Sequence, residues 1–351
     1  MRLIPDPLVG RLRRMARDRL GPLARTGAVT DGALIGALRA MDAFSFEAPV
    51  EADGLDLGVT AGIVVGAELG RLALQDVYGP AALVGDVLRA EGRPAGAAGP
   101  FVLGGMDHAA RAVRRHGAAW EMTGRVVLPR DGDESARCCL AADTGGGTSL
   151  VLLSPDAWRK RATPLPGGCQ SLDLHGLVIG AEEVLGGLDD GVLARARVRQ
   201  AAYLLGLAGG ACEHAAAYAR ERRQFGRTLM EFQSIAFTLA QAEIALHAVR
   251  LSLDRAAWLA DSGGAEGTAG EPATAAVGTL AQAAETALRV VRQAVQIHGA
   301  RGMTREAPVH RFYELARTEA TRFGSPSPLW REAGARRLRA RPTTGPAALR
   351  G

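Results

Sequence analysis

The sequence predicts an α+β fold in which a helical region, a compact β region and a helical bundle follow one another along the chain. Two changes of pattern carry this prediction: short runs separated by turn residues replace helical spacing near residue 100, and long helical periods return near residue 188. We therefore expect an N-terminal helical domain over residues 1–99, a central β-barrel or sandwich domain over 100–187, a C-terminal four-helix bundle over 188–338 and a tail over 339–351.

The composition is that of a globular protein with two or three domains. Of the 351 residues 47% are hydrophobic and 23% charged, and the four cysteines lack the spacing of a zinc site or a disulfide framework, so reduced thiols are expected. The net charge of +5 is carried almost wholly by arginine, since Lys160 is the only lysine. Arginines also occur singly along helices between acidic residues, so a nucleic-acid partner is not expected. The apolar runs are too short to form a helix that spans a bilayer, so no membrane segment is expected. The first residues do not resemble a secretory signal, and we therefore expect a cytoplasmic protein.

The first hundred residues show helical spacing of apolar side chains. Leu8 and Leu12 follow it near the start, and Leu83 and Val87 follow it further on. The segment 91–100 is rich in glycine, proline and alanine, so it should end this helical region.

The middle of the chain consists of short apolar runs bounded by turn residues such as Asp143-Thr-Gly-Gly-Gly and Pro164-Leu-Pro-Gly-Gly. Regular alternation of strand and turn favours a compact β domain. The expected strands are Phe101–Leu103, Ala118–Met122, Val126–Leu128, Cys138–Ala142, Ser149–Leu153 and Leu172–Ile179.

Long helices are expected after residue 188. The candidates are 192–223, 230–261, 272–298 and 305–321. Apolar periods sustained over ~30 residues are long for one amphipathic surface helix and suit a four-helix bundle or a subunit interface.

Two segments of this last region stand out. The first is Arg222-Arg-Gln-Phe-Gly226, and the second is Gln296-Ile-His-Gly-Ala-Arg-Gly302. Together they resemble the acyl-CoA dehydrogenase family, in which an Arg-x-Gln-Phe-Gly segment ends the first bundle helix and a Gln-x-His-Gly-Gly-x-Gly segment ends the third. The order of helices, strands and helices also resembles that family from about residue 100 onward. Either segment alone would be read as an ordinary helix terminus.

The resemblance implies that FAD is the cofactor and that the first segment contacts it. A pyrophosphate is bound well by an arginine fork, and Arg222 is the matching position. Gln224 adds a neutral donor, and Phe225 supplies a flat apolar surface. Gly226 lets the helix end without a steric penalty on the backbone.

The second segment is implied to approach the adenosine part of the same cofactor. Gln296 and Gly299 match the family's pattern, whereas Ala300 replaces its second glycine and adds a methyl group. By resemblance these groups reach the FAD of a neighbouring subunit, so we expect a homodimer or tetramer, or a complex with a related acyl-CoA dehydrogenase-like subunit.

The family's catalytic base is missing from both of its usual positions. The family removes a proton beside a thioester carbonyl, which requires a carboxylate. Phe323 stands where one glutamate is expected, and Gly191 stands at the alternative position on the first bundle helix. Asp189 or Asp190 could substitute, but acidic residues at a helix start more often complement the helix dipole.

The β region also departs from the family. Leu103-Gly-Gly-Met-Asp-His-Ala-Ala stands where the family has a Thr-Glu-x-x-x-Gly-Ser-Asp loop against the flavin ring. The ADP half of an FAD site is therefore recognisable, while the half that holds the reactive ring in the same subunit is weak.

Three functions remain open. The first is an acyl-CoA dehydrogenase-like subunit for α,β-dehydrogenation of an acyl thioester on coenzyme A or a carrier protein, dependent on a partner that supplies the base. The second is an FAD-dependent oxidase or monooxygenase on the same fold, and the third is a scaffold that has lost the cofactor. No metal site is expected, because the histidines lack metal-ligand spacing.

Overall fold

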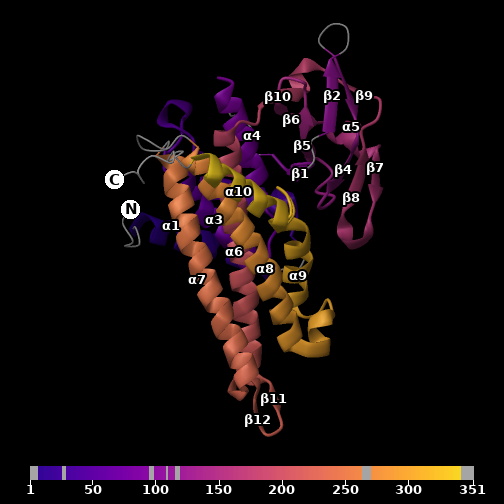
Figure 1. Cartoon of the computed structure of the whole chain (residues 1–351). Coiled ribbons are helices and arrows are strands. Elements are labelled where there is room, and N and C mark those ends of the chain that lie inside the picture. Colours follow the sequence, from indigo (N-terminus) through magenta and orange to yellow (C-terminus); the bar gives the residue numbers. More distant parts are fainter. Residues whose placement is uncertain are drawn as a thin grey trace, which may run out of the picture.

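Helices form both ends of the chain and strands form its middle (Figure 1), so the predicted α+β fold is confirmed. None of the described helices combines the length and apolar character needed to traverse a lipid bilayer. The structure is a computed structural model that describes residues 7–25, 29–94, 99–107, 110–114, 119–262 and 270–340.

Within the described residues, four α-helices precede the strands. Their bounds are α1 Pro7–Ala24, α2 Asp31–Ala40, α3 Val59–Arg71 and α4 Tyr78–Ala90. Thr30 fixes the start of α2, because its side-chain oxygen accepts a hydrogen bond from the backbone N–H of Ala33. Almost every residue of α3 is buried, which agrees with its nearly continuous apolar sequence.

Among the described residues, the strands of the central region form two sheets that share a separate hydrophobic cluster. In the larger sheet the order is β10-β6-β5-β2-β3-β9, and β1 pairs in parallel with β5; the smaller sheet has the order β4-β8-β7. A short helix, α5 (Pro155–Arg159), follows β6. The strands are β1 Phe101–Gly104, β2 Ala110–Arg114, β3 Trp120–Thr123, β4 Arg125–Leu128, β5 Arg137–Asp143, β6 Thr148–Leu153, β7 Ala162–Pro164, β8 Gln170–Asp173, β9 Leu177–Ile179 and β10 Val184–Gly187.

The prediction of a single strand over residues 172–179 is wrong. It is divided between β8 and β9, which belong to different sheets. The chain turns between them because the carboxylate of Asp173 accepts the backbone N–H of His175, and because Gly176 adopts a φ of 67°. The short strands β2, β7 and β10 have no counterpart in the prediction, and position 118 of another predicted strand lies outside the described residues.

Five of the α-helices that the structure describes lie in the C-terminal part. The four predicted bundle helices are present, with ends that differ from prediction by no more than about three residues, and α10 follows them. Only residues 339 and 340 of the predicted tail are described, and they end α10. The bounds are α6 Asp190–Glu221, α7 Gln233–Asp261, α8 Glu271–His298, α9 Pro308–Glu319 and α10 Pro326–Ala340.

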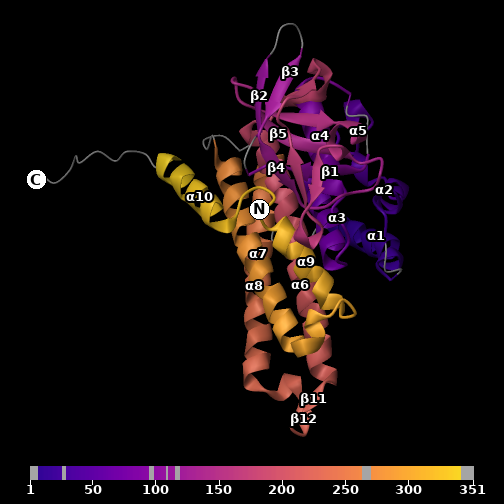
Figure 2. The same ribbon diagram turned by 90° about the vertical axis from the view of Figure 1, so that its right-hand side faces the viewer.

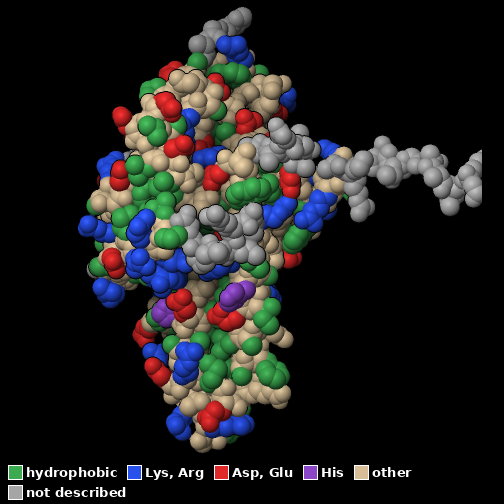
Figure 3. Space-filling view, turned by 90° about the vertical axis from the view of Figure 1, so that its left-hand side faces the viewer, with side chains coloured by type: hydrophobic (Ala, Val, Ile, Leu, Met, Phe, Trp, Pro, Cys, Tyr) green, Lys and Arg blue, Asp and Glu red, His purple; other side chains and the backbone are tan. Residues whose placement is uncertain are grey.

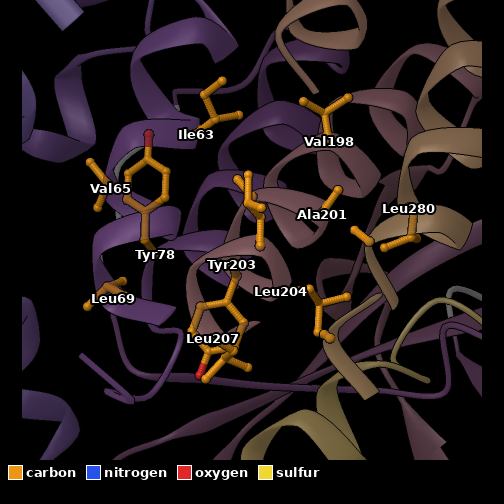
Figure 4. Close-up of a cluster of buried hydrophobic side chains, with 14 of the residues drawn as sticks. Ile63, Val65, Leu69, Tyr78, Val198, Ala201, Tyr203, Leu204, Leu207 and Leu280 are labelled. Carbon is orange, nitrogen blue, oxygen red and sulfur yellow. The ribbon is translucent and has the colours of Figure 1, made fainter. Parts of the chain in front are cut away.

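The N-terminal helices and the bundle share one hydrophobic core. Figure 4 shows its centre, where side chains from α3 and α4 meet those of α6 and Leu280 of α8. The closest approach is between α3 and α6. A Cβ on Gly70 would lie 2.1 Å from the carbonyl oxygen of Tyr203, and one on Gly206 would lie 2.1 Å from that of Ala67. Only glycine permits backbones this close, so the two helices are tightly joined.

Buried charges join the same two parts of the chain. The Glu47 carboxylate accepts hydrogen bonds from Arg199 Nε (2.8 Å) and the Tyr78 hydroxyl (2.7 Å), and Arg195 Nη2 adds a third at 3.0 Å. Arg199 also pairs with Asp86 at 2.7 Å. Burial alone would raise the pKa of Asp86, but the neighbouring guanidinium groups outweigh it and lower that pKa.

Candidate cofactor site

The first predicted segment forms a hairpin at the end of α6. Arg222 is the C-terminal cap of the helix, and the strands β11 (Arg223–Gln224) and β12 (Arg227–Thr228) follow it. The two turn residues have positive φ values, 51° at Phe225 and 81° at Gly226, as a two-residue hairpin of the I′ type requires. An aromatic residue rarely adopts this conformation, and Phe225 is also 92% exposed. Its ring lies edge-on to that of Phe232, with centroids 6.4 Å apart, and the positive φ carries a conformational cost.

The second predicted segment ends α8. Gln296 lies exposed in the last turn of the helix, and Gly299 caps it with φ 61° and ψ −142°. A Cβ on Gly299 would meet nothing within 4 Å, so its backbone conformation, and not crowding, requires glycine there.

An aromatic pair brings these two segments to the same end of the bundle. The rings of Tyr218 and His298 stack with centroids 4.4 Å apart and an interplanar angle of 17°. Tyr218 precedes Arg222 by one helical turn, and Gln296 stands two residues before His298. Figure 1 shows both helix ends at the lower end of the bundle, beside the β11–β12 hairpin. We call the set Arg222, Gln224, Phe225, Gln296 and Gly299 the bundle-end cradle.

The donor chemistry of the bundle-end cradle fits the ADP half of a dinucleotide. Within the described part of the chain, the side chains of Arg222 and Gln296 have no hydrogen-bonding partner, and both are exposed. A free guanidinium suits a pyrophosphate, an amide suits neutral acceptors, and an exposed ring suits a base or sugar face. The cradle is therefore open toward a ligand or a neighbouring molecule.

A cleft lies elsewhere, between the strands and α9. It has a volume of about 230 Å³ and is lined by the end of β1, by Asp107 and Cys169, and by Arg317 and Arg322 of the opposite wall. A larger hollow of about 630 Å³ adjoins it across Thr318. The side chain of Arg317 covers Gly167 so closely that an added Cβ there would lie 2.0 Å from its Nη2. Arginine thus occupies part of the space between the β region and the bundle.

The expected base positions hold no proton acceptor in this structure. Phe323 is buried and belongs to the hydrophobic core, next to a buried Arg322 that pairs with Asp76 at 3.2 Å and with Glu319 at 2.6 Å. Gly191 lies in the first turn of α6. The ion pairs of Arg322 beside the cleft are therefore structural, and the charge of this arginine is already balanced by Asp76 and Glu319.

Asp189 and Asp190, the two residues that could replace the base, are both engaged in other hydrogen bonds. Asp189 caps α6 by accepting the backbone N–H of Val192 at 2.8 Å. Asp190 accepts two hydrogen bonds from Arg336, at 2.7 and 2.8 Å, and these bonds lower the pKa of Asp190. Both carboxylates stabilise the start of α6, as acidic residues at a helix N-terminus commonly do.

The cradle and the cleft of one chain are far apart. Gln200 donates a hydrogen bond to the backbone carbonyl of Glu319 (2.8 Å), so this level of α6 lies beside the cleft wall. Arg222 follows 22 residues later, which places it about 33 Å further along the helix axis. The turned view agrees, with the hairpin at the opposite end of the bundle from the strands (Figure 2).

Sequence reasoning missed the arginines of the cleft wall, Arg317 and Arg322, and the buried Arg199. Two of these arginines have partners that are distant in the sequence: Arg322 pairs with Asp76, and Arg199 pairs with Glu47. No local pattern distinguishes them from the many arginines of exposed helix faces, so only the fold reveals them.

Comparisons with known proteins agree with this architecture. Residues 189–337 match the model of the acyl-CoA dehydrogenase C-terminal domain. The chain is 34% identical over 166 residues to a 3-(aryl)acrylate reductase of Clostridium sporogenes, which covers 45% of this chain and 42% of the relative. It is 29% identical over 258 residues to the acyl-CoA dehydrogenase FadE27 of Mycobacterium tuberculosis, covering 72% of this chain and 67% of the relative. The chain thus spans less than half of the reductase's length and about two thirds of FadE27's.

Solved structures share the fold over nearly the whole chain. The ChsE4-ChsE5 complex of Mycobacterium tuberculosis superposes with a TM-score of 0.79 at 21% identity, covering 97% of this chain and all of that one. The helical bundle with its inserted β region is thus the fold of solved acyl-CoA dehydrogenases. Residues 189–337 belong to the acyl-CoA dehydrogenase C-terminal domain family, and acyl-CoA dehydrogenases depend on FAD.

Proposed function

We propose that this chain is a subunit of an acyl-CoA dehydrogenase-like flavoenzyme that oxidises an acyl thioester carried by coenzyme A or a carrier protein. In this proposal the chain pairs with a related subunit and presents its bundle-end cradle to FAD held mainly by that partner. The partner supplies the catalytic base.

The observation that carries the proposal is the position of the cradle. Its residues are exposed at the end of the bundle, about 33 Å along α6 from the level of the chain's own cleft. A dinucleotide gripped there extends away from that cleft and toward another molecule. The strained, exposed Phe225 supports this interpretation, because backbone strain is retained where a contact requires it.

The residues of the cradle would divide the binding between them. Arg222 would neutralise the pyrophosphate, Gln224 and Gln296 would donate hydrogen bonds to neutral oxygens, and Phe225 would cover an apolar face and exclude water. When bound, FAD supplies the acceptor for the hydride that leaves the acyl chain. The chain's own contribution is orientation, since both base positions are occupied by residues that cannot accept a proton.

The chain retains residues for one half of the cofactor site and lacks those of the other half. This difference favours a partner that is related to this chain but not identical to it. The recognisable cradle, the buried Phe323 and the arginine-filled cleft together describe a subunit that keeps one half of a shared site. A structural relative is described as a complex of two components, ChsE4 and ChsE5, so this fold does assemble with a second chain in that case.

The test is flavin retention, with and without partners. The chain is purified alone and after co-expression with acyl-CoA dehydrogenase-like proteins encoded beside it, and bound FAD is measured by absorbance after gel filtration. We expect little flavin on the chain alone and a full complement on one complex. A full complement on the chain alone, bleached by an acyl-CoA, would refute partner dependence. Absence of flavin from every complex would favour the scaffold function.

Substitutions then locate the contact. Arg222→Ala should lower flavin retention by the complex at least tenfold, because a charge-assisted contact is lost. Arg220→Ala is the matched control, since Arg220 is an equally exposed arginine two residues earlier on α6. Equal retention by both variants would contradict the proposed role of Arg222.

A further inference from the structure

A separate hollow lies between α1, α3, α6 and α7. It has a volume of about 160 Å³, and among the described residues it shares no lining residue with the cleft or with the larger hollow beside the cleft. Figure 3 views the side of the molecule on which α1 and α7 lie in Figure 1 and shows basic side chains gathered above the narrow shaft of the bundle. We call the hollow the arginine pocket. Its charged lining residues are Arg13, Arg17, Glu68, Arg71, Glu213, Arg250 and Asp254.

The uncharged part of the lining leaves room for an apolar group. Gly209 of α6 lines the pocket, and a Cβ at this position would meet nothing within 4 Å. The side chains of Ile63, Val64, Leu205 and Leu253 also line it, and all four residues are buried. Apolar cavities of roughly this size hold a molecule as large as benzene. The pocket can therefore take a short hydrocarbon body or a single ring.

Three arginines share one carboxylate at this pocket. Glu68 is buried, and it accepts hydrogen bonds from Arg71 Nε at 2.7 Å and from Arg17 Nε at 3.1 Å. The Nε atom of Arg13 lies 4.0 Å from the same carboxylate. Arg71 has a second partner in Glu213, at 3.2 Å from its Nη1. Arg13 is thus the least well paired of the three, and its N–H donors remain available to another acceptor.

A fourth arginine, Arg250 of α7, adds to the positive charge beside Arg13. Burial and the repulsion by Arg250 lower the pKa of Arg13, and the attraction of Glu68 offsets these effects only in part. Asp254 lies near both arginines, but its partial burial raises its own pKa. Within the part of the chain that the structure describes, Arg250 has no hydrogen bond or ion pair. A bound anion would therefore relieve the repulsion between Arg13 and Arg250.

The balance of charge in the lining indicates the class of ligand. Four arginines and three carboxylates line the pocket, which leaves one positive charge. A carboxylate carries one negative charge at neutral pH, whereas a phosphate group carries up to about two, and the second would be repelled by the three carboxylates. Guanidinium groups also bind carboxylates through paired N–H donors. The lining therefore suits a monovalent carboxylate better than a phosphate.

We propose that the arginine pocket binds a small organic carboxylate whose apolar body is no larger than about one aromatic ring. Arg13 and Arg250 would donate hydrogen bonds to the carboxylate, and the apolar body would lie against Leu205 and the open position at Gly209. This proposal goes beyond the cofactor role and does not depend on it. Gly209 stands 13 residues before Arg222 on α6, which places the pocket about 20 Å along the helix axis from the bundle-end cradle.

Calorimetric titration of the full chain with benzoate tests the class of ligand. Benzyl alcohol, which has the ring without the charge, and inorganic phosphate, which has charge without a ring, are titrated at the same ionic strength. We expect one benzoate per chain and binding of either comparison ligand that is at least about tenfold weaker. Equal binding of benzyl alcohol would show that the arginines are not used. Equal binding of phosphate would show that the apolar lining is not used. Either result, or the absence of saturable benzoate binding, would overturn the proposal.

Paired substitutions locate the bound benzoate. Arg13→Gln should weaken its binding at least about tenfold, because a charge-assisted hydrogen bond is lost. Arg14→Gln is the matched control, since Arg14 is the next residue of α1, is exposed and does not line the pocket. Circular dichroism verifies that both variants fold. Equal benzoate affinity of the two variants would contradict the assignment of Arg13.

A second pair of variants tests the apolar part of the pocket. Gly209→Leu should fill the space and abolish benzoate binding. Gly36→Leu is its control, because Gly36 is an exposed glycine of α2 whose added Cβ would also meet nothing within 4 Å. Benzoate binding that survives Gly209→Leu would place the ligand elsewhere and overturn the proposal. Flavin retention by a complex is measured separately, so the two proposals can fail independently.

Discussion

Two glycines of α6 provide a sharp test of the contact between α3 and α6. Gly206 and Gly209 lie three residues apart on the same helix, but a Cβ on Gly206 would sit 2.1 Å from the carbonyl oxygen of Ala67, whereas one on Gly209 would meet nothing within 4 Å. Ordinary van der Waals contact begins at 3.4 Å. The substitution Gly206→Ala must therefore push the helices apart by more than 1 Å or distort them.

The two alanine variants should move stability in opposite directions. Alanine is favoured over glycine inside a helix by about 1 kcal/mol, so Gly209→Ala should raise the free energy of unfolding by up to about that amount. Gly206→Ala gains the same propensity but overpacks the core, which typically costs about 1–3 kcal/mol and more when backbone atoms collide. Urea denaturation followed by circular dichroism measures both. Equal stability of the two variants would refute the close backbone contact described here.

Four further outcomes are expected. Glu47→Leu should lower the free energy of unfolding by about 3–5 kcal/mol in urea titration, because it leaves the buried cation of Arg199 with Asp86 alone. Since the folded state lowers the pKa of Asp86, its contribution to stability is full above about pH 4 and is lost as the pH falls further; Asp86→Asn should flatten this part of a stability–pH profile. Phe225→Asn should keep or raise the melting temperature, since asparagine tolerates positive φ, while lowering flavin retention by the complex. At pH 8 a thiol reagent should label Cys169 first in the native chain, as quantified by mass spectrometry, and a ligand in the cleft should protect it.

The helices and their order follow from local pattern. Apolar periodicity and turn residues placed α6 to α9 within about three residues, because long amphipathic helices carry many consistent signals. Short strands carry few signals, so β2, β7 and β10 were not predicted and 172–179 was read as one strand. The turn that divides that segment depends on the carboxylate of Asp173 and on one glycine. These two signals are weaker than the apolar run that predicts a continuous strand.

The site was predictable to the extent that its contacts are local. Arg222, Phe225 and Gln296 sit at helix ends that sequence motifs mark, and the structure brings those ends together through the Tyr218–His298 stack. Their contact with FAD stays a prediction. The cleft wall was not predictable, since Arg322 finds Asp76 across 246 residues of sequence. The exposed hydrophobic side chains of α7, such as Ile244 and Leu251, were visible only as part of a long helical period, because the same spacing describes buried and exposed faces until neighbours are known.

The shared helical core has a consequence for how this chain can vary. The polypeptide leaves the helices after α4 and rejoins them at α6, and the strands between have a hydrophobic cluster of their own. The β region is thus an insertion into the helical part of the chain, but it is not independent of that part. Phe101, Leu103 and Leu150 of its strands belong to the core that the helices share, so a change of volume at these positions must repack the helices. Side chains confined to the separate cluster, such as Met122 and Leu172, can be exchanged without that cost.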